Sequence, residues 1–160
     1  MRLYLVQHGD ALPKEQDPER PLSEQGRADV ASVAHFAQQA GVEVYQIRHS
    51  GKRRAQETAD ILADYLKPNG GVTSLPGLAP QDDVRLIAEL LSSETRPLLL
   101  VGHLPSMERL AGFLVAGDAQ RSVVTFQKGG IVCLEREAST RAWSIQWAIT
   151  PDLISQTGGE

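Results

Sequence analysis

The sequence contains only one cysteine, Cys133, among 160 residues. A single thiol excludes a disulfide framework within the chain and a cysteine-rich metal site. Because Cys133 lies in an apolar strand pattern, we expect it to be buried and unreactive. No apolar run reaches the roughly 18 residues that cross a membrane, and the first residues lack the regions of a signal peptide. These absences predict a soluble, cytoplasmic protein with no membrane partner.

The sequence also lacks an excess of positive charge. The 16 Lys and Arg residues against 20 Asp and Glu give a formal net charge of -4, which disfavours a nucleic-acid partner. There is no glycine-rich nucleotide motif, since neither Gly9 nor Gly102 belongs to a GxGxxG or GxxxxGK(S/T) pattern. At this length, residues 1–160 are predicted to form a single domain with a sizeable core.

Strands and helices alternate through most of the chain. Uninterrupted apolar runs are typical of strands buried on both faces, and apolar residues three and four apart are typical of helices packed on one side. The predicted strands are Arg2–Gln7, Val44–Arg48 and Leu98–Val101. The predicted helices begin at Ser23, at Ser50, at Asp82 or Asp83, and after Pro105, and the first ends at Gly41.

The pattern changes beyond Gly117. Val123–Gln127 and Ile131–Glu135 are predicted strands around a hairpin-like turn, and Trp143–Ile149 alternates as a strand does. Asn69–Pro80 is rich in Gly and Pro and is predicted to be a surface loop. The order of elements predicts an α/β fold: a three-layer α/β/α sandwich with a mainly parallel central sheet and an antiparallel edge.

Two predicted strands are followed in the same way by a histidine and a turn. His8 follows the first strand, and His103 follows Leu98–Val101. Ligands of α/β proteins bind at the carboxyl ends of the strands, so both imidazoles are expected to face one crevice. One such histidine alone is more often structural, but two in equivalent places favour catalysis. His35 and His49 show no partner pattern and are interpreted as structural.

Three cations, Lys52, Arg53 and Arg54, stand at a helix start, where the helix dipole favours anions. A bound phosphate or carboxylate would compensate for this arrangement. The alternative is a solvated face, which we expect for Lys52 and Arg53. Arg20 either reaches the same crevice from its loop or lies on the surface. A metal is not expected, because two histidines fall short of the three protein ligands of a typical catalytic zinc.

Three ordered segments resemble the signatures of the histidine phosphatase superfamily: Val6–Asp10, Ser50–Thr58 and Val101–Pro105. The short chain and the segments Arg20–Ser23 and Leu78–Val84 make it most similar to the SixA-type phosphohistidine phosphatases. The resemblance spans nearly the whole chain. It is also specific, because three motifs in the right order identify a family better than any one of them.

The resemblance implies a residue-by-residue mechanism without metal or other cofactor. His8 would be the nucleophile, phosphorylated in turnover, while Arg54 and His103 would hold the phosphoryl oxygens and Arg20 would be an outer phosphate contact. The implied substrate is phosphohistidine in a protein, a chemistry of signal transduction. A small phosphorylated molecule and a phosphate-binding regulatory module with weakened activity are the alternatives.

Two positions depart from the family's pattern. Gln7 stands where the first motif usually has Arg; its amide can contact phosphate but brings no charge and no bidentate fork. Leu104 stands where some relatives acting on phosphate esters have the carboxylate that protonates the leaving group. Asp10, Asp82 and Asp83 remain candidates for that general acid. A missing acid favours phosphohistidine, because imidazole protonated at its far nitrogen leaves as a neutral ring.

Overall fold

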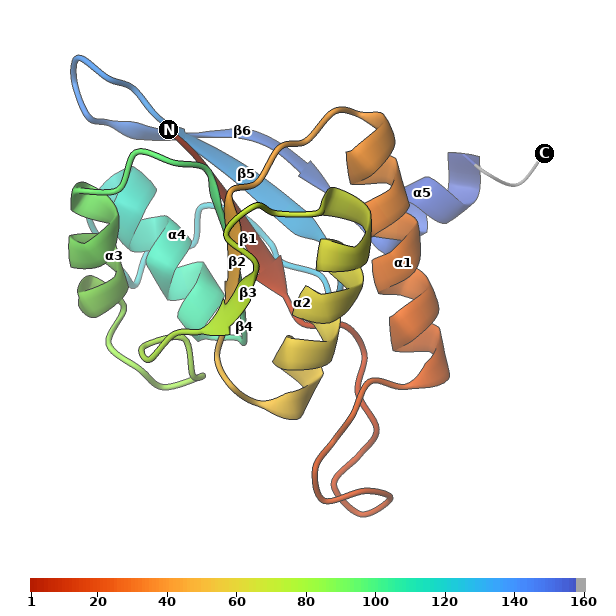
Figure 1. Ribbon diagram of the computed structural model, residues 1–160. Coiled ribbons are helices and arrows are strands. Elements are labelled where there is room, and N and C mark those ends of the chain that lie inside the picture. The colour runs from red at the N-terminus through yellow and green to blue at the C-terminus, as the bar shows by residue number, and fades with distance from the viewer. Residues whose placement is uncertain (158–160) are drawn as a thin grey trace.

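The computed structural model describes residues 1–157, and the side chains of residues 1–155 (Figure 1). The elements in this part of the chain follow in the order β1 (Arg2–Gln7), α1 (Glu24–Gln39), β2 (Gln46–His49), α2 (Arg53–Leu66), β3 (Val72–Ser74), α3 (Val84–Ser92), β4 (Leu98–Gly102), α4 (Ser106–Ala116), β5 (Ile131–Arg136), β6 (Trp143–Ile149) and α5 (Pro151–Thr157). None of these helices is long and apolar enough to cross a membrane.

The strands form one sheet in the order β3-β2-β4-β1-β5-β6. β1 lies between β4, to which it is parallel, and β5, to which it is antiparallel. β2 is parallel to both β4 and β3, whereas β6 is antiparallel to β5. The sheet is therefore parallel around β4 and antiparallel at one edge, which confirms the predicted α/β arrangement.

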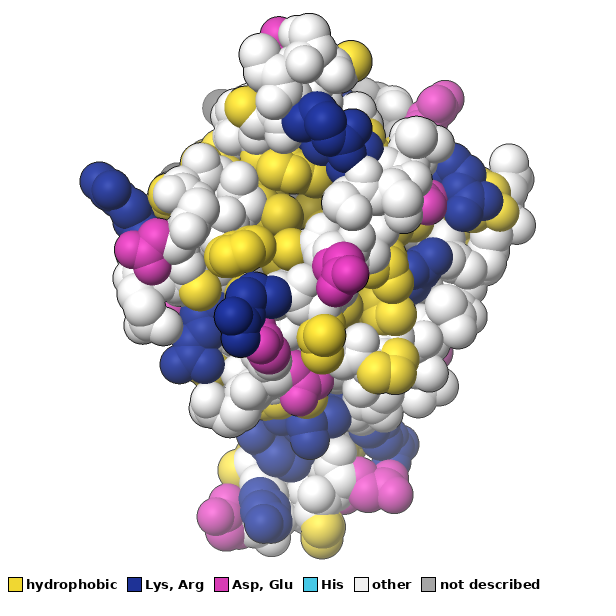
Figure 2. All heavy atoms as spheres, turned by 90° about the vertical axis from the view of Figure 1, so that its left-hand side faces the viewer, with side chains coloured by type: hydrophobic (Ala, Val, Ile, Leu, Met, Phe, Trp, Pro, Cys, Tyr) yellow, Lys and Arg dark blue, Asp and Glu magenta, His cyan; other side chains and the backbone are white. Residues whose placement is uncertain are grey.

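Helices cover both faces of the sheet, as Figure 1 shows. Alternate residues of β1 belong to different cores: Tyr4 and Val6 pack with α1 and α2, and Leu3 and Leu5 pack with α3 and α4. Successive side chains of a strand point to opposite faces, so this alternation divides the core into two layers. Figure 2, which looks onto the side of α3 and α4, shows acidic and basic side chains interspersed among apolar ones.

The predicted strand Val123–Gln127 is wrong. This segment is irregular and places Phe126 in the core beside α4, while the amide of Gly129 donates to the carbonyl oxygen of Gln7 at 2.9 Å. The hairpin forms instead between β5 and β6, across residues 137–142. Apolar residues that fill one side of a core without pairing give the same sequence pattern as a short strand.

Other boundaries also differ from the predictions. The predicted loop Asn69–Pro80 contains β3, an edge strand of three residues whose side chains are half-buried or exposed, so it has no apolar alternation. The second strand, Gln46–His49, begins two residues later and ends one residue later than predicted. α5 was not predicted. The caps of two helices are confirmed, since Ser23 accepts from the amide of Gly26 and Asp83 from that of Arg85.

The end of β1 is pressed against the start of α1 through Gly26. A Cβ atom at Gly26 would lie 2.1 Å from the carbonyl oxygen of Asp10. The amide of Ser23 donates to that same oxygen at 2.9 Å. The helix can therefore approach the chain that leaves β1 only because residue 26 has no side chain, and this contact fixes the turn that follows His8.

Candidate functional site

The two histidines predicted to share a crevice lie side by side. Gln7 pairs with Gly102 in the parallel register of β1 and β4, so His8 and His103 are the next residues along two adjacent strands. The amide of His8 donates to the carbonyl oxygen of Gly102 at 3.1 Å. The two ring centroids are 4.9 Å apart, and the residues are only 8% and 2% exposed. The two rings are neighbours because each histidine directly follows one of two paired residues on adjacent parallel strands.

The imidazole of His8 is held in a defined tautomer. Its Nδ1 lies 2.7 Å from the carbonyl oxygen of Gly9, and a carbonyl can only accept, so Nδ1 carries the hydrogen. Nε2 therefore has a free electron pair, and Nε of Arg54 donates toward it at 3.4 Å. Burial, aided by the positive charge of Arg54, lowers the pKa of His8 to about 4. At neutral pH the ring is an uncharged nitrogen nucleophile.

His103 contacts the residue that was expected to cap α2. Nε2 of His103 lies 2.7 Å from Oγ of Ser50, and burial, then the nearby His8 and Arg54, lowers the pKa of His103 to about 3. α2 begins later, at Arg53, with Lys52 as an N-cap that makes no side-chain hydrogen bond. The prediction that Ser50 caps the helix is therefore wrong. Its hydroxyl accepts from the amide of Lys52 at 3.3 Å, one residue before the helix begins, and also contacts a site histidine.

Thr58 connects the turn after β1 to α2, and the sequence motifs alone gave it no role. Its Oγ1 accepts from the amide of Gly9 at 3.0 Å and donates to the carbonyl oxygen of Arg54 at 2.7 Å. The residue is fully buried. Its position four residues after Arg54 on the same helix face was the available signal. The threonine fixes the backbone of His8 relative to that of Arg54.

The remaining predicted cations differ in whether their charge reaches the histidines. Lys52 is exposed as expected, but its charge is among those that lower the pKa of His103. The charge of Arg20 contributes to the lowered pKa values of His8, Arg54 and His103, so its guanidinium lies near all three. Nε of Arg20 donates to the carbonyl oxygen of Leu12 at 3.1 Å. Arg53, in contrast, is exposed and pairs with Glu19. The structure therefore brings together four predicted site residues, His8, Arg20, Arg54 and His103.

Gln7 is the last residue of β1, and His8 follows it directly. It lines an open groove of about 610 Å³ together with Leu104, Phe126 and Lys128. Gln7 precedes His8 and Leu104 follows His103 in the sequence, whereas neither histidine is among the residues that line the groove. No hydrogen bond occupies the Gln7 amide within the described residues.

The three aspartates considered as general acids all have other partners. Asp10 accepts from Ser23 at 2.7 Å and from Lys128 at 3.1 Å, and these bonds hold the pKa of Asp10 below its usual value. Asp82 accepts from the amide of Ala79 at 3.0 Å, and Asp83 caps α3. We therefore assign none of them to leaving-group protonation. Among the described residues, no group of three or more His, Cys, Asp or Glu is placed to hold a metal ion.

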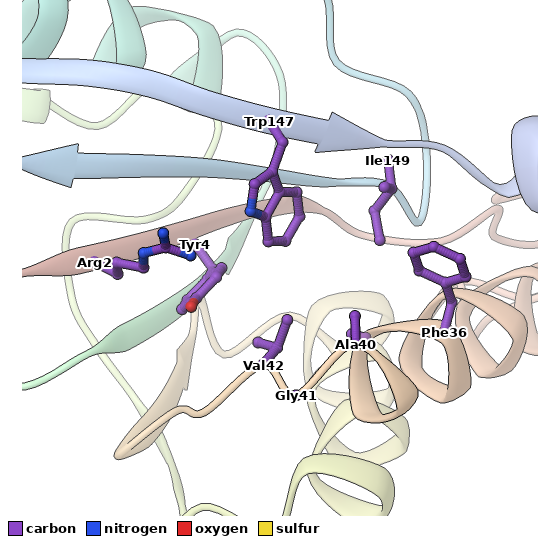
Figure 3. A pocket seen from close by; sticks show the side chains of 9 residues that line it. Arg2, Tyr4, Phe36, Ala40, Gly41, Val42, Trp147 and Ile149 are labelled. Atoms are coloured by element: carbon purple, nitrogen blue, oxygen red, sulfur yellow. The ribbon is translucent and has the colours of Figure 1, made fainter.

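A second cavity is separate from the histidines. It measures about 290 Å³ and lies between the end of α1 and the sheet, where Tyr4, Phe36 and Trp147 face one another (Figure 3). Its β1 residues, Arg2 and Tyr4, belong to the amino-terminal half of the strand, whereas His8 follows the carboxyl end. The cavity therefore takes no part in the chemistry of the histidine site.

Lowering the pH from 7 to 5 is expected to reduce the free energy of unfolding. Folded His8 and His103 bind protons only near pH 4 and 3, whereas in the unfolded chain they do so near 6.5. Between these pH values the unfolded state binds more protons than the folded state. The stability that the two neutral histidines contribute is therefore fully present above about pH 6.5 and is lost as the pH falls. Urea unfolding at both pH values measures the change. A variant with both histidines replaced by asparagine should show a smaller decrease, and an equal decrease would contradict the assignment.

Comparison with known proteins agrees with this geometry. Residues 3–81 match the model of the histidine phosphatase superfamily (branch 1). The phosphohistidine phosphatase SixA of Escherichia coli is 31% identical over 150 residues, which cover 91% of this chain and 93% of that protein. The chain therefore belongs to the histidine phosphatase superfamily.

Within the superfamily, the similarity is to the SixA type. A structure of SixA complexed with tungstate has a TM-score of 0.85 and 24% identity, covering 96% of this chain and 99% of that one. A SixA structure from Agrobacterium tumefaciens has a TM-score of 0.75 and 23% identity, covering 94% and 97%. The 31% identity and the shared fold together confirm the resemblance that the three sequence motifs indicated.

Proposed function

We propose that the protein is a phosphatase that hydrolyses phosphohistidine in other proteins, through a covalent phosphohistidine at His8. The observation that carries the proposal is the state of the His8 ring. Nδ1 is committed to the Gly9 carbonyl, and Nε2 is uncharged beside Arg54 and His103. A protein that merely bound phosphate would have no use for an oriented, unprotonated nitrogen at this point.

The first step transfers the phosphoryl group to His8. Nε2 attacks phosphorus in line, the phosphorus–nitrogen bond of the substrate breaks, and its electron pair returns to the leaving imidazole. Arg54 stabilises the charge on the phosphoryl oxygens, and His103, whose ring lies beside that of His8, contacts the same oxygens. The phosphorylated His8 ring is positive, and the Gly9 carbonyl, which accepts from Nδ1 at 2.7 Å, stabilises that charge.

The second step releases inorganic phosphate. A water oxygen attacks phosphorus, the bond to Nε2 breaks, and the electron pair returns to the His8 ring. The protons of the water remain with the phosphate. Because one phosphorus–nitrogen bond replaces another in the first step, the leaving group needs little acid catalysis. This agrees with the hydrogen bonds and the ion pair that occupy Asp10.

The open groove favours a protein substrate over a compact metabolite. Its volume is about 610 Å³, and its lining includes Gln7 and Leu104, the sequence neighbours of His8 and His103. The relative from Escherichia coli bears the name phosphohistidine phosphatase, and this supports the same substrate class here. The chemical alternative is a phosphomonoesterase, which requires an acid for its alkoxide leaving group.

The test is to incubate the protein with a phosphohistidine-carrying protein and, separately, with an alkyl phosphate. We expect faster release of phosphate from phosphohistidine, and phosphate on His8 after rapid quenching. Faster turnover of the alkyl phosphate would favour the phosphomonoesterase. Turnover without any phosphoenzyme would contradict the covalent mechanism, and phosphate binding without turnover would identify a regulatory module.

Replacing Gln7 by arginine is expected to raise kcat/KM for phosphohistidine by about tenfold. One charged donor to a developing anion contributes about 10²- to 10³-fold in established sites, and a donor added beside Arg54 contributes less. Gln127→Arg is the matched control, because it places the same charge in the same groove at an exposed position. Unchanged rate and phosphate affinity in Gln7→Arg would contradict this account of Gln7.

A further inference from the structure

Lys128 is anchored beside the one position of the site that lacks its usual charge. It belongs to the irregular segment before β5, and the amide of the next residue, Gly129, donates to the carbonyl oxygen of Gln7 at 2.9 Å. Lys128 and Gln7 also line the same groove. This backbone hydrogen bond thus holds the backbone of Lys128 next to the end of β1.

The ammonium group of Lys128 lies on the His8 side of this anchor. Its Nζ is 3.1 Å from Oδ1 of Asp10, two residues after His8. The positive charge of Lys128 is among those that lower the pKa of His8, after burial and the charges of Arg54 and Arg20. Lys128 is therefore close enough to His8 for its charge to act on that ring.

The pairing of Lys128 with Asp10 is of a kind that exchanges easily. The two side chains are 54% and 43% exposed, and exposed ion pairs contribute only about 0–1 kcal/mol. Asp10 keeps a second partner in any case, because Oγ of Ser23 donates to its other oxygen at 2.7 Å. A phosphoryl group with up to two negative charges attracts the ammonium more strongly than one carboxylate does.

We propose that Lys128 is a phosphoryl-binding residue that supplies the positive charge absent at Gln7. Asp10 holds Nζ beside His8 before substrate binds, and Nζ moves onto the phosphoryl oxygens when the substrate enters. The inference rests on the proposed phosphatase function, and the two can fail separately. A lysine suits this role because its ammonium binds phosphate as a point charge on a flexible stem.

A double-mutant cycle tests whether Lys128 and residue 7 serve the same purpose. With Gln7 in place, Lys128→Met should lower kcat/KM for phosphohistidine by about 10- to 100-fold. This is less than the 10²- to 10³-fold of a preorganised donor, because Nζ must first leave Asp10. In the Gln7→Arg background, Lys128→Met should lower kcat/KM by less than about threefold, because the guanidinium then supplies the positive charge in place of Lys128. Lys128→Arg should retain most of the activity. The affinity for inorganic phosphate, measured by calorimetry, should follow the same order.

Lys67→Met is the matched control, since it removes the same charge at the C-cap of α2. This residue lies about 20 Å from Arg54 along the helix, at 1.5 Å per residue. If Lys128→Met behaves like Lys67→Met, the proposal is overturned. Equal losses in both backgrounds at residue 7 would also overturn it, because they would show a structural effect. If the unaltered protein binds phosphate through Lys128 but releases none from phosphohistidine, the proposed function fails while this inference stands.

Discussion

Replacing His8 by alanine is expected to abolish turnover of phosphohistidine and formation of the phosphoenzyme. We expect kcat to fall by about 10⁴-fold or more, the scale on which loss of a nucleophile acts in a covalent mechanism. The reason is specific to the ring. Nε2 is the unprotonated nitrogen that faces Arg54, and Nδ1 is bonded to the Gly9 carbonyl, so Nε2 is the atom of this ring that is oriented to take the phosphoryl group.

The measurement is single-turnover incubation with ³²P-labelled phosphohistidine, followed by rapid quenching and gel separation. Wild-type protein should carry transient label, and His8→Ala should carry none. His35→Ala is the matched control, because His35 is an exposed histidine of α1 whose ring packs on Tyr65. Wild-type-like phosphate release by His8→Ala would contradict the mechanism. Intact phosphate binding by the same variant shows that it remains folded.

The meeting of His8 and His103 could be predicted because it depends on the backbone alone. Each follows a strand of continuous apolar residues, and the two strands pair in parallel with Gln7 opposite Gly102. Residues with the same offset from paired positions point to the same face. The two histidines are therefore neighbours because each comes directly after a buried apolar strand, Leu3–Val6 with Gln7 or Leu98–Val101 with Gly102.

The supporting contacts could not be predicted, because they cross between elements distant in the sequence. Thr58 bonds to Gly9 across 49 residues, and Lys128 to Asp10 across 118. Ser50 had a sound local reading as a helix cap, but its hydroxyl bonds to His103 instead. Local propensity was overridden at the site, where polar groups serve tertiary contacts.

The same distinction explains the errors in the fold. Val123–Gln127 has the apolar residues of a strand, yet its backbone pairs with no neighbouring strand and its Phe126 fills the core beside α4. β3 is a strand with hardly any apolar signal, because it lies at the sheet edge and pairs only with β2. An apolar pattern indicates that a segment is buried. Buried segments are paired strands in the middle of the sheet, whereas an edge strand can pair without being buried.

Replacing Arg54 by methionine is expected to lower kcat by about 10²- to 10³-fold, the cost of removing one preorganised donor from a developing oxyanion. Arg54 stands in the first turn of α2, and Thr58 bonds to its carbonyl oxygen at 2.7 Å, so the guanidinium is directed at His8 by the backbone. Arg54→Lys should recover only part of the loss, because an ammonium lacks the planar fork that binds two phosphoryl oxygens.

Arg53→Met is the matched control for this variant. Arg53 precedes Arg54 in the same helical turn, but it is exposed and pairs with Glu19, so its loss should change kcat by less than about twofold. Equal losses at the two positions would show that α2 needs both charges and would contradict the assignment.

The pH profile separates two causes of the Arg54 effect. Burial is the main reason for the lowered pKa of His8, and the charge of Arg54 is a smaller one. His8 should therefore stay unprotonated at pH 7 in Arg54→Met, and raising the pH to 8.5 should restore no activity. Recovery at high pH would mean that Arg54 acts by keeping His8 unprotonated. No recovery means that it acts on the phosphoryl group.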